Sequence, residues 1–187
     1  MTPQPFCFNK SHVRAIILGA DPTNYSDGGK QVKLQYAFGI GQDPRYFSGI
    51  LENLNKLGLH LEDLYIDNLL PDYQAKETGK NKDFVKHAKL GIPDLLKRIA
   101  KVNDSKNLPV FLTSFEVYKT VLKESEKIWT AKELYNLETE VPVPAVKNLL
   151  GRPLIPLFRH SDYKLNKFPI YLRNIRNYLM EILEGEK

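Results

Sequence analysis

Four short runs of apolar residues, spread along the whole chain, place the strongest constraint on the fold. They read VRAIIL, DLYIDN, PVFLTS and LIPLF, with their apolar parts at residues 13–18, 64–66, 109–112 and 154–158. Each run is too short for a helix, is rich in Ile, Val, Leu or Phe, and ends at small or polar residues. This pattern is typical of strands that are buried on both faces of a sheet.

Segments with a helical spacing of apolar residues separate these runs. They cover residues 49–59, 83–102, 115–123 and 168–183. Gly91 and Pro93 interrupt the second segment, which leaves open whether it forms one helix or two. Alternating strands and helices predict an α/β protein with a mainly parallel sheet and helices on both faces. The length favours a single domain over residues 1–187.

Composition limits the classes of function. The only cysteine, Cys7, excludes an internal disulfide and any cluster that needs several thiolates. No HExxH motif or paired Cys/His spacing indicates a metal, so we expect no metal and no cofactor. The N-terminus does not resemble a signal peptide and no apolar run could cross a bilayer, so we expect a cytoplasmic protein without a membrane partner. The net charge of +5 is compatible with a polyanionic partner but does not identify one.

Polar side chains follow each predicted strand. Asp21 follows the first, Asn68 the second, Ser114 the third and His160 the fourth. In open parallel sheets, ligands bind beyond the carboxyl ends of the strands, so we expect these side chains to converge at one edge. Each also has a structural interpretation, since Asp-Pro begins many turns, a serine can cap a helix, and a loop histidine can simply be solvated.

The first half of the chain carries motifs that resemble those of the uracil-DNA glycosylase superfamily. In that family a strand leads to Gly-Gln-Asp-Pro-Tyr, and residues 19–23 here read GADPT. The family continues with Leu-Ala-Phe-Ser-Val, which is similar to YAFGI at residues 36–40. A leucine-asparagine pattern comes next, and LENL at residues 51–54 resembles it.

The order of the resemblance continues in the second half. A strand ends in asparagine, as in IDN at residues 66–68, before a glycine-containing stretch similar to KETG at residues 76–79. The last strand leads to a His-Pro-Ser loop, which FRHS at residues 158–161 resembles. The resemblance implies a three-layer α/β/α sandwich with a central, mainly parallel four-stranded sheet.

The activity implied by this resemblance is excision of uracil or a related damaged base from DNA, without metal. The enzyme would flip the base into a pocket and hydrolyse its N-glycosidic bond. Asp21 would stabilise the cation-like sugar and position water, and His160 would donate a hydrogen bond to the leaving base. An asparagine amide such as Asn68 matches the N3–H donor and O4 acceptor of uracil. Phe38 would stack on the base, although it is equally a candidate core residue.

Departures from the family motifs affect base choice and the last loop. Ala20 stands where the family has glutamine, and Thr23 where it has a tyrosine that is associated with excluding the thymine methyl. Asn24 or Tyr25 is a candidate to fill that space, so the excised base remains open.

The last loop lacks the family proline between histidine and serine. If Ser161 is aligned with the motif serine, Arg159 falls where the histidine belongs, so Arg159 and His160 are alternatives for the same role.

Contacts to the DNA backbone are expected from polar, cationic and apolar residues near the strand ends. Serines before predicted helices favour phosphate binding or serve as simple N-caps. An apolar or aromatic side chain would fill the space that the flipped base leaves. The candidates are Ser48, Ser114, Ser161, Tyr163, Leu165 and Lys164, with Tyr163 and Leu165 as the wedge.

Two other functions remain open at this point. The same fold could be a DNA- or nucleotide-binding module that has lost catalysis, or a small-molecule N-glycosidase. The sequence has neither GxGxxG nor GxxxxGK[ST], which gives no support to a phosphate-loop enzyme. We expect DNA, single- or double-stranded and carrying a damaged base, as the partner, and a monomeric protein.

Overall fold

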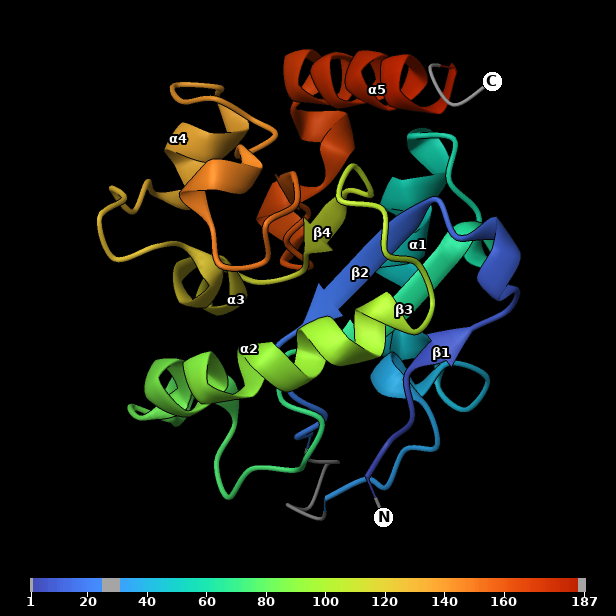
Figure 1. Ribbon diagram of the computed structural model, residues 1–187, viewed down its shortest axis with the longest axis vertical. Coiled ribbons are helices and arrows are strands. Elements are labelled where there is room, and N and C mark those ends of the chain that lie inside the picture. Colours follow the sequence, from blue (N-terminus) through green and yellow to red (C-terminus); the bar gives the residue numbers. More distant parts are fainter. Residues whose placement is uncertain (1, 25–30, 185–187) are drawn as a thin grey trace.

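The computed structural model describes residues 2–24 and 31–184, without the side chains of residues 183 and 184, and is built around a five-stranded mixed sheet (Figure 1). The strand order is β1-β3-β2-β4-β5. Four strands are parallel and lie within the four apolar runs of the sequence: β2 (Ala15–Gly19), β3 (Leu64–Asn68), β4 (Val110–Leu112) and β5 (Leu154–Pro156). All residues of these four strands are buried, which explains their continuous apolar character.

The prediction of a four-stranded sheet was wrong by one strand. β1 (Phe6–Cys7) pairs antiparallel with β3, with Phe6 opposite Ile66 and Cys7 opposite Tyr65. A strand of two half-buried residues produces no apolar run and no alternation, so no local pattern predicts it.

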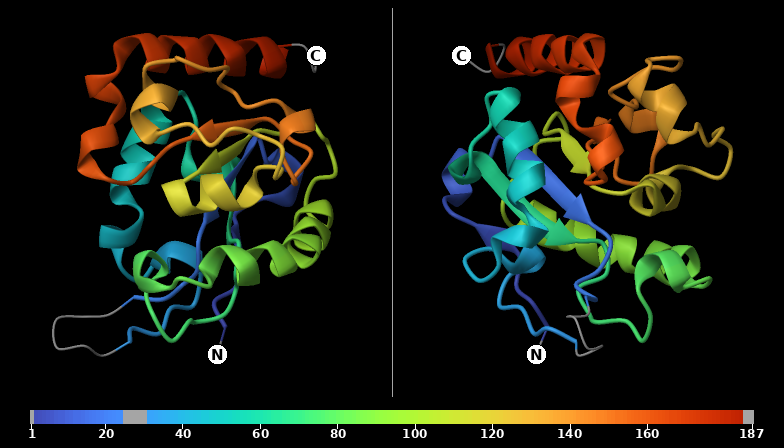
Figure 2. Two further views of the ribbon diagram at one scale, coloured as in Figure 1. Left: turned by 90° about the vertical axis from the view of Figure 1, so that its left-hand side faces the viewer. Right: turned by 180° about the vertical axis from the view of Figure 1, so that it is seen from behind.

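Helices cover both faces of the sheet, as predicted. The described residues contain five α-helices: α1 (Ser48–Lys56), α2 (Phe84–Ala100), α3 (Phe115–Val121), α4 (Ala131–Tyr135) and α5 (Pro169–Glu184). Figures 1 and 2 show α1 and α2 on opposite faces of the sheet, and α3 contacts α2. α5 is linked to the α1 side, because Nη2 of Arg176 donates a hydrogen bond to the carbonyl oxygen of Lys56 at 2.7 Å.

Short 3₁₀ helices form most of the remaining regular structure. They comprise Lys10–His12, Ala37–Gly39, Pro44–Tyr46, Leu61–Asp63, Thr78–Lys80, Ala145–Lys147, Ser161–Tyr163 and Leu165–Lys167. Several of these turns follow the carboxyl ends of strands, so they build the edge of the sheet where a site was expected.

The predicted helical segment at residues 83–102, which could have formed one helix or two, forms the single helix α2. α2 continues through Pro93, whose side chain is exposed. Ile92, Leu95 and Ile99 form a buried face along the helix. Their burial holds the helix together across the hydrogen bond that proline cannot make.

The segment between α3 and β5 contains α4 and an extended portion. Val143 pairs antiparallel with Leu154, so this chain covers the outer edge of β5. Residues 141–148, which read VPVPAVKN, start in an extended conformation and continue into the 3₁₀ turn Ala145–Lys147. No helix in residues 2–24 or 31–184 is both long and apolar enough to span a membrane.

The strand order creates a topological switch point between β2 and β4. From β2 the chain crosses by α1 to β3 on one side, and then by α2 to β4 on the other side of β2. The chain leaves β2 toward β3 and leaves β4 toward β5, in opposite directions along the sheet, so the loops after β2 and β4 diverge. In open α/β sheets, the crevice at such a point is the usual ligand site.

Candidate functional site

A cavity of about 520 Å³ lies at this switch point. Its volume is within the range typical of small-ligand sites, roughly 300–1,000 Å³. It brings together residues that follow each of the four parallel strands and residues from the loop between β2 and α1. Among the predicted site residues, its wall contains Ala20, Asp21, Thr23, Phe38, Asn68, Ser114 and Arg159.

The carboxylate of Asp21 is held in one orientation. Its Oδ1 accepts a hydrogen bond from the backbone N–H of Thr23 at 2.8 Å, and its Oδ2 accepts one from the hydroxyl of Thr78. The Thr23 hydroxyl in turn accepts from the backbone N–H of Gln74 at 2.6 Å. Each carboxylate oxygen can accept more than one hydrogen bond, so Asp21 retains capacity for a water or a ligand.

Asn68 is largely buried, with 4% of the residue exposed, and its side chain borders the cavity. Within the part of the chain that the structure describes, no residue forms a hydrogen bond with its amide. The amide atoms are not among the sealed, unpaired polar atoms of this part of the chain, so they are open to the cavity. The amide is thus available to a ligand with a complementary donor and acceptor.

The backbone of Asn68, in contrast, is bound on both sides. Its N–H donates to Oδ1 of Asp67 at 2.7 Å, and Nη2 of Arg98 donates to its carbonyl oxygen at 3.0 Å. Nε of Arg98 and the hydroxyl of Tyr65 both donate to Oδ2 of Asp67, at 2.8 and 2.9 Å. This network fixes the position from which the Asn68 amide extends.

Burial determines the ionisation of this network. It raises the pKa of the Asp67 carboxyl, an effect that the nearby Arg98 guanidinium opposes. It also raises the pKa of the Tyr65 phenol, and the neighbouring Asp67 raises it further. Neither Asp67 nor Arg98 was predicted from the sequence as part of the site. An acid inside an apolar strand was the available signal, because a buried carboxylate requires a partner.

Gly19, the last residue of β2, allows two side chains to meet. A Cβ atom at this position would lie 2.6 Å from Cζ of Phe38 and closer still to Oδ1 of Asn68. The Phe38 ring is 8% exposed, contacts the edge of the Phe47 ring, and borders the cavity. Phe38 is therefore a core residue and a wall of the cavity at once.

Tyr46 is a cavity residue that the sequence analysis also missed. Its hydroxyl donates to Oδ1 of Asn24 at 3.0 Å, and Nδ2 of Asn24 donates to the carbonyl oxygen of Pro22 at 2.8 Å. Tyr46 thus places a tyrosine side chain at the cavity, although the position that carries a tyrosine in the resembled family is occupied here by Thr23. The other candidate for that space, Tyr25, lies outside the described residues.

A second cavity, of about 800 Å³, adjoins the first. The two share four wall residues, Tyr46, Thr113, Ser114 and Arg159. For clarity, we call the one that contains Asp21 and Asn68 the polar cavity, and the larger one the aromatic cavity, because its wall includes Phe115, Phe158 and Tyr163.

His160 lies in the wall of the aromatic cavity, so it does not meet Asp21 and Asn68 as expected. Its exposed ring caps the turn Ser161–Tyr163, with Nδ1 accepting from the backbone N–H of Asp162 at 3.3 Å. Arg159, one residue earlier, borders both cavities. The strand β5 delivers Arg159 rather than His160 to the polar cavity.

The candidates for DNA contact are in mixed positions. Ser114 borders both cavities and caps α3 by accepting from the N–H of Val117 at 3.3 Å. Ser48 is the exposed first residue of α1 and belongs to neither cavity wall. Tyr163 is half-buried and Lys164 exposed. Leu165 is fully buried, so it cannot act as an inserted wedge without leaving the core, and that assignment was wrong.

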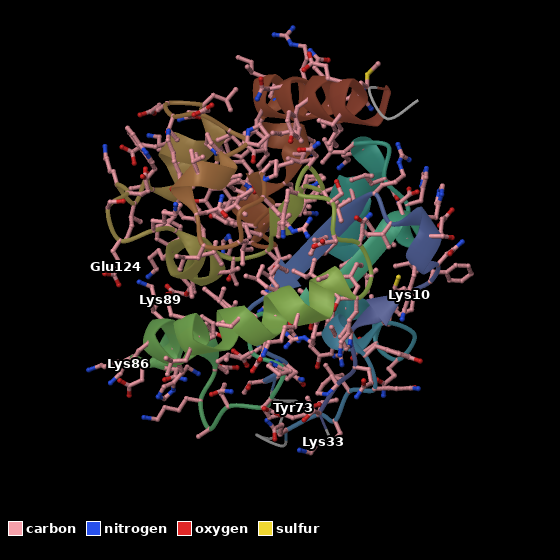
Figure 3. All side chains as sticks on the ribbon, viewed as in Figure 1. Lys10, Lys33, Tyr73, Lys86, Lys89 and Glu124 are labelled. Atoms are coloured by element: carbon pink, nitrogen blue, oxygen red, sulfur yellow. The ribbon has the colours of Figure 1, made fainter. Side chains whose placement is uncertain are left out.

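Lysine side chains lie on several sides of the molecule. Figure 3 labels Lys10, Lys33 and Lys86 near three different edges of the view. Lys33 lies over the ring of Tyr73, at 4.3 Å from its centroid. The net charge therefore does not locate a binding surface by itself.

The fold and the site define this chain as an α/β protein with a ligand-sized polar cavity at the switch point of its sheet. Across residues 2–24 and 31–184, no group of three or more His, Cys, Asp or Glu side chains is arranged to hold a metal ion. A scan against protein-family models and a search of curated proteins both gave no match to this chain.

Proposed function

We propose that this protein is a DNA base-excision glycosylase with a three-layer fold of the uracil-DNA glycosylase type. The observation that carries the proposal is the amide of Asn68, which has no hydrogen-bond partner among the described residues and is open to the same cavity as the fixed carboxylate of Asp21. A base-reading group and a group suited to a developing positive charge thus border the same space, as excision requires.

Recognition of the base falls to Asn68 and Phe38. Uracil presents an N3–H donor beside an O4 acceptor, and the oxygen and NH₂ of one amide match that pair. Cytosine presents the reverse pattern, so an amide that is fixed in one orientation discriminates against it. The ring of Phe38 supplies an apolar surface for the base beside the amide.

Asp21 and Arg159 have different roles in hydrolysis of the N-glycosidic bond. The C1′–N1 bond breaks with its electron pair on the base, which leaves an anionic base and a cation-like sugar. The carboxylate of Asp21 stabilises the sugar, and it accepts a proton from the water that adds to C1′. Arg159 replaces His160 as the donor to the anionic base, because it borders the polar cavity and His160 does not.

A binding module without catalysis is the second candidate. It is favoured by one observation, namely that both carboxylate oxygens of Asp21 already accept hydrogen bonds within the protein. On this alternative, Asp21 organises the loop at residues 72–81 and the polar cavity holds a base or nucleotide that is not cleaved.

An excision assay separates these functions. The protein is incubated with labelled oligonucleotides that contain uracil, hypoxanthine, xanthine or a thymine mismatch, and abasic sites are then cleaved with alkali. Scission in any lane supports a glycosylase and identifies its base. Retained binding with no scission supports the binding module, whereas release of base from free nucleosides alone indicates a small-molecule N-glycosidase.

A further inference from the structure

We propose that the aromatic cavity binds the base of the nucleotide next to the target in the same strand, so that the protein recognises two consecutive unstacked nucleotides. This inference rests on the proposed function, because it takes the polar cavity as the site of the target base. It adds a second binding site and a preference for single-stranded nucleic acid.

The lining of the aromatic cavity suits a flat, uncharged ring system. The ring of Phe158, which is buried, meets Phe115 at 84° and Tyr163 at 87°, with centroids 6.1 and 5.7 Å away. Phe115 and Tyr163 are only half-buried, so their rings offer surface to a ligand. Aromatic side chains of this kind are the usual stacking partners of unpaired bases, whatever the base.

The wall between the cavities fits the linkage between two nucleotides. Tyr46, Ser114 and Arg159 border both cavities, so a ligand that occupies both must pass these residues. Arg159 is exposed and carries a permanent positive charge that can pair with a phosphodiester. Adjacent nucleotides are joined through one such anionic group, which makes a dinucleotide unit the natural occupant.

The charges near this wall are compatible with an anionic strand. Glu116 borders the polar cavity, but it is paired with Lys119 at 2.8 Å. The ammonium of Lys119 also lies 5.4 Å from the centroid of the Phe115 ring. The carboxylate of Glu116 is thus compensated by a cation on the same helix.

Binding of two neighbouring bases outside a stack predicts a preference for single strands. In a duplex, both bases must be unpaired and unstacked, and each costs a few kcal/mol. In a single strand most of this cost is absent. Single-stranded oligonucleotides should therefore bind more tightly than the same sequence in a duplex.

Equilibrium binding tests this inference without relying on excision. The probes are fluorescently labelled single-stranded oligonucleotides with one uracil, in which the base on its 5′ or its 3′ side is replaced by an abasic tetrahydrofuran. The Asp21→Asn protein is used so that the probe stays intact. Loss of the neighbouring base on one of the two sides should weaken binding about tenfold to a hundredfold.

Two variants connect the effect to the aromatic cavity. Phe115→Ala removes a stacking surface, and Ala131→Trp places a bulky ring in the wall, so both should bind the intact probe as weakly as the abasic one. Phe8→Ala is the matched control, because Phe8 is 74% exposed and is in neither cavity wall. Thermal melts verify that each variant is folded, and Ala131→Trp retains the test if Phe115→Ala does not fold.

The outcomes separate the two proposals. Equal binding of intact and both abasic probes, or equal binding of single strand and duplex, would overturn the second-base site. Uracil excision that ignores the neighbouring base would also overturn it, while leaving the glycosylase proposal intact. Neighbour-dependent binding with no excision of any base by the unaltered protein would support the site and refute the glycosylase.

Discussion

The polar and aromatic cavities share a wall but are constructed in different ways. The polar cavity depends on hydrogen bonds that fix individual atoms, from the Thr78 hydroxyl to Asp21 and from the Asn68 N–H to Asp67. The aromatic cavity depends on ring packing, for example the edge-on contacts of Phe158 with its neighbours.

This difference indicates a division of tasks. Directed donors and acceptors distinguish one base from another, because a mismatched partner leaves a buried group unpaired. Ring surfaces bind many bases with similar strength, because every base has a flat face. The polar cavity is thus suited to selecting a base, and the aromatic cavity to holding a neighbour of any sequence.

The largest expected effect comes from breaking the ion pair behind the polar cavity. Arg98→Met leaves the buried Asp67 carboxylate without its cation, and such a loss typically costs about 3–5 kcal/mol of stability. Chemical denaturation measures the change. Lys97→Met is the matched control, because its pair with Asp94 is on the surface and its loss should change stability little. A small effect of Arg98→Met would show that this network does not hold the site.

The next effect concerns catalysis rather than stability. Asp21→Asn keeps the shape of the side chain but removes the charge, so excision should slow by about 10²–10³-fold while the melting temperature changes little. Single-turnover rates with uracil-containing DNA measure the loss. Asp94→Asn is the control, since Asp94 is on the exposed side of α2. A near-normal rate for Asp21→Asn contradicts the role of the carboxylate.

The parallel strands and most helices could be predicted from the sequence because burial leaves a local pattern. The runs at β2 to β5 are apolar at nearly every position, and Asp21 and Asn68 follow from the rule that sites gather at carboxyl ends. β1 could not be predicted, since its two residues carry no periodicity.

The composition of the cavity walls depended on contacts between distant segments. Tyr46 borders the polar cavity and bonds to Asn24, and Arg98 of α2 supports Asn68 from outside the wall through its carbonyl oxygen and Asp67. No local pattern reveals either contact. The choice between Arg159 and His160 depended on the direction in which β5 ends. Arg159 borders the polar cavity, whereas His160, one residue further along the chain, borders only the aromatic cavity.

Two glycines, one beside each cavity, allow the tightness of packing in the two cavities to be compared, with smaller expected effects. Gly19→Ala inserts a Cβ against Phe38 and Asn68, so overpacking should cost about 1–3 kcal/mol. Gly49→Ala, in α1 at the wall of the aromatic cavity, meets no atom within 4 Å and should instead stabilise the helix by up to about 1 kcal/mol. Thermal and chemical unfolding measure both, and equal effects would mean that the polar cavity is not tightly assembled.

The smallest expected change in stability comes from Asn68→Leu, and its sign is informative. The Asn68 amide has no hydrogen-bond partner among the described residues and is open to the polar cavity, so a leucine of similar size removes no bond within the protein. It should leave the free energy of unfolding unchanged or raise it by up to about 1 kcal/mol. The same change should abolish selection of uracil over cytosine in binding. A structural asparagine would give the opposite result, a loss of stability on substitution. Greater stability with lost selectivity would therefore show that this side chain is retained for its ligand at a cost to the fold.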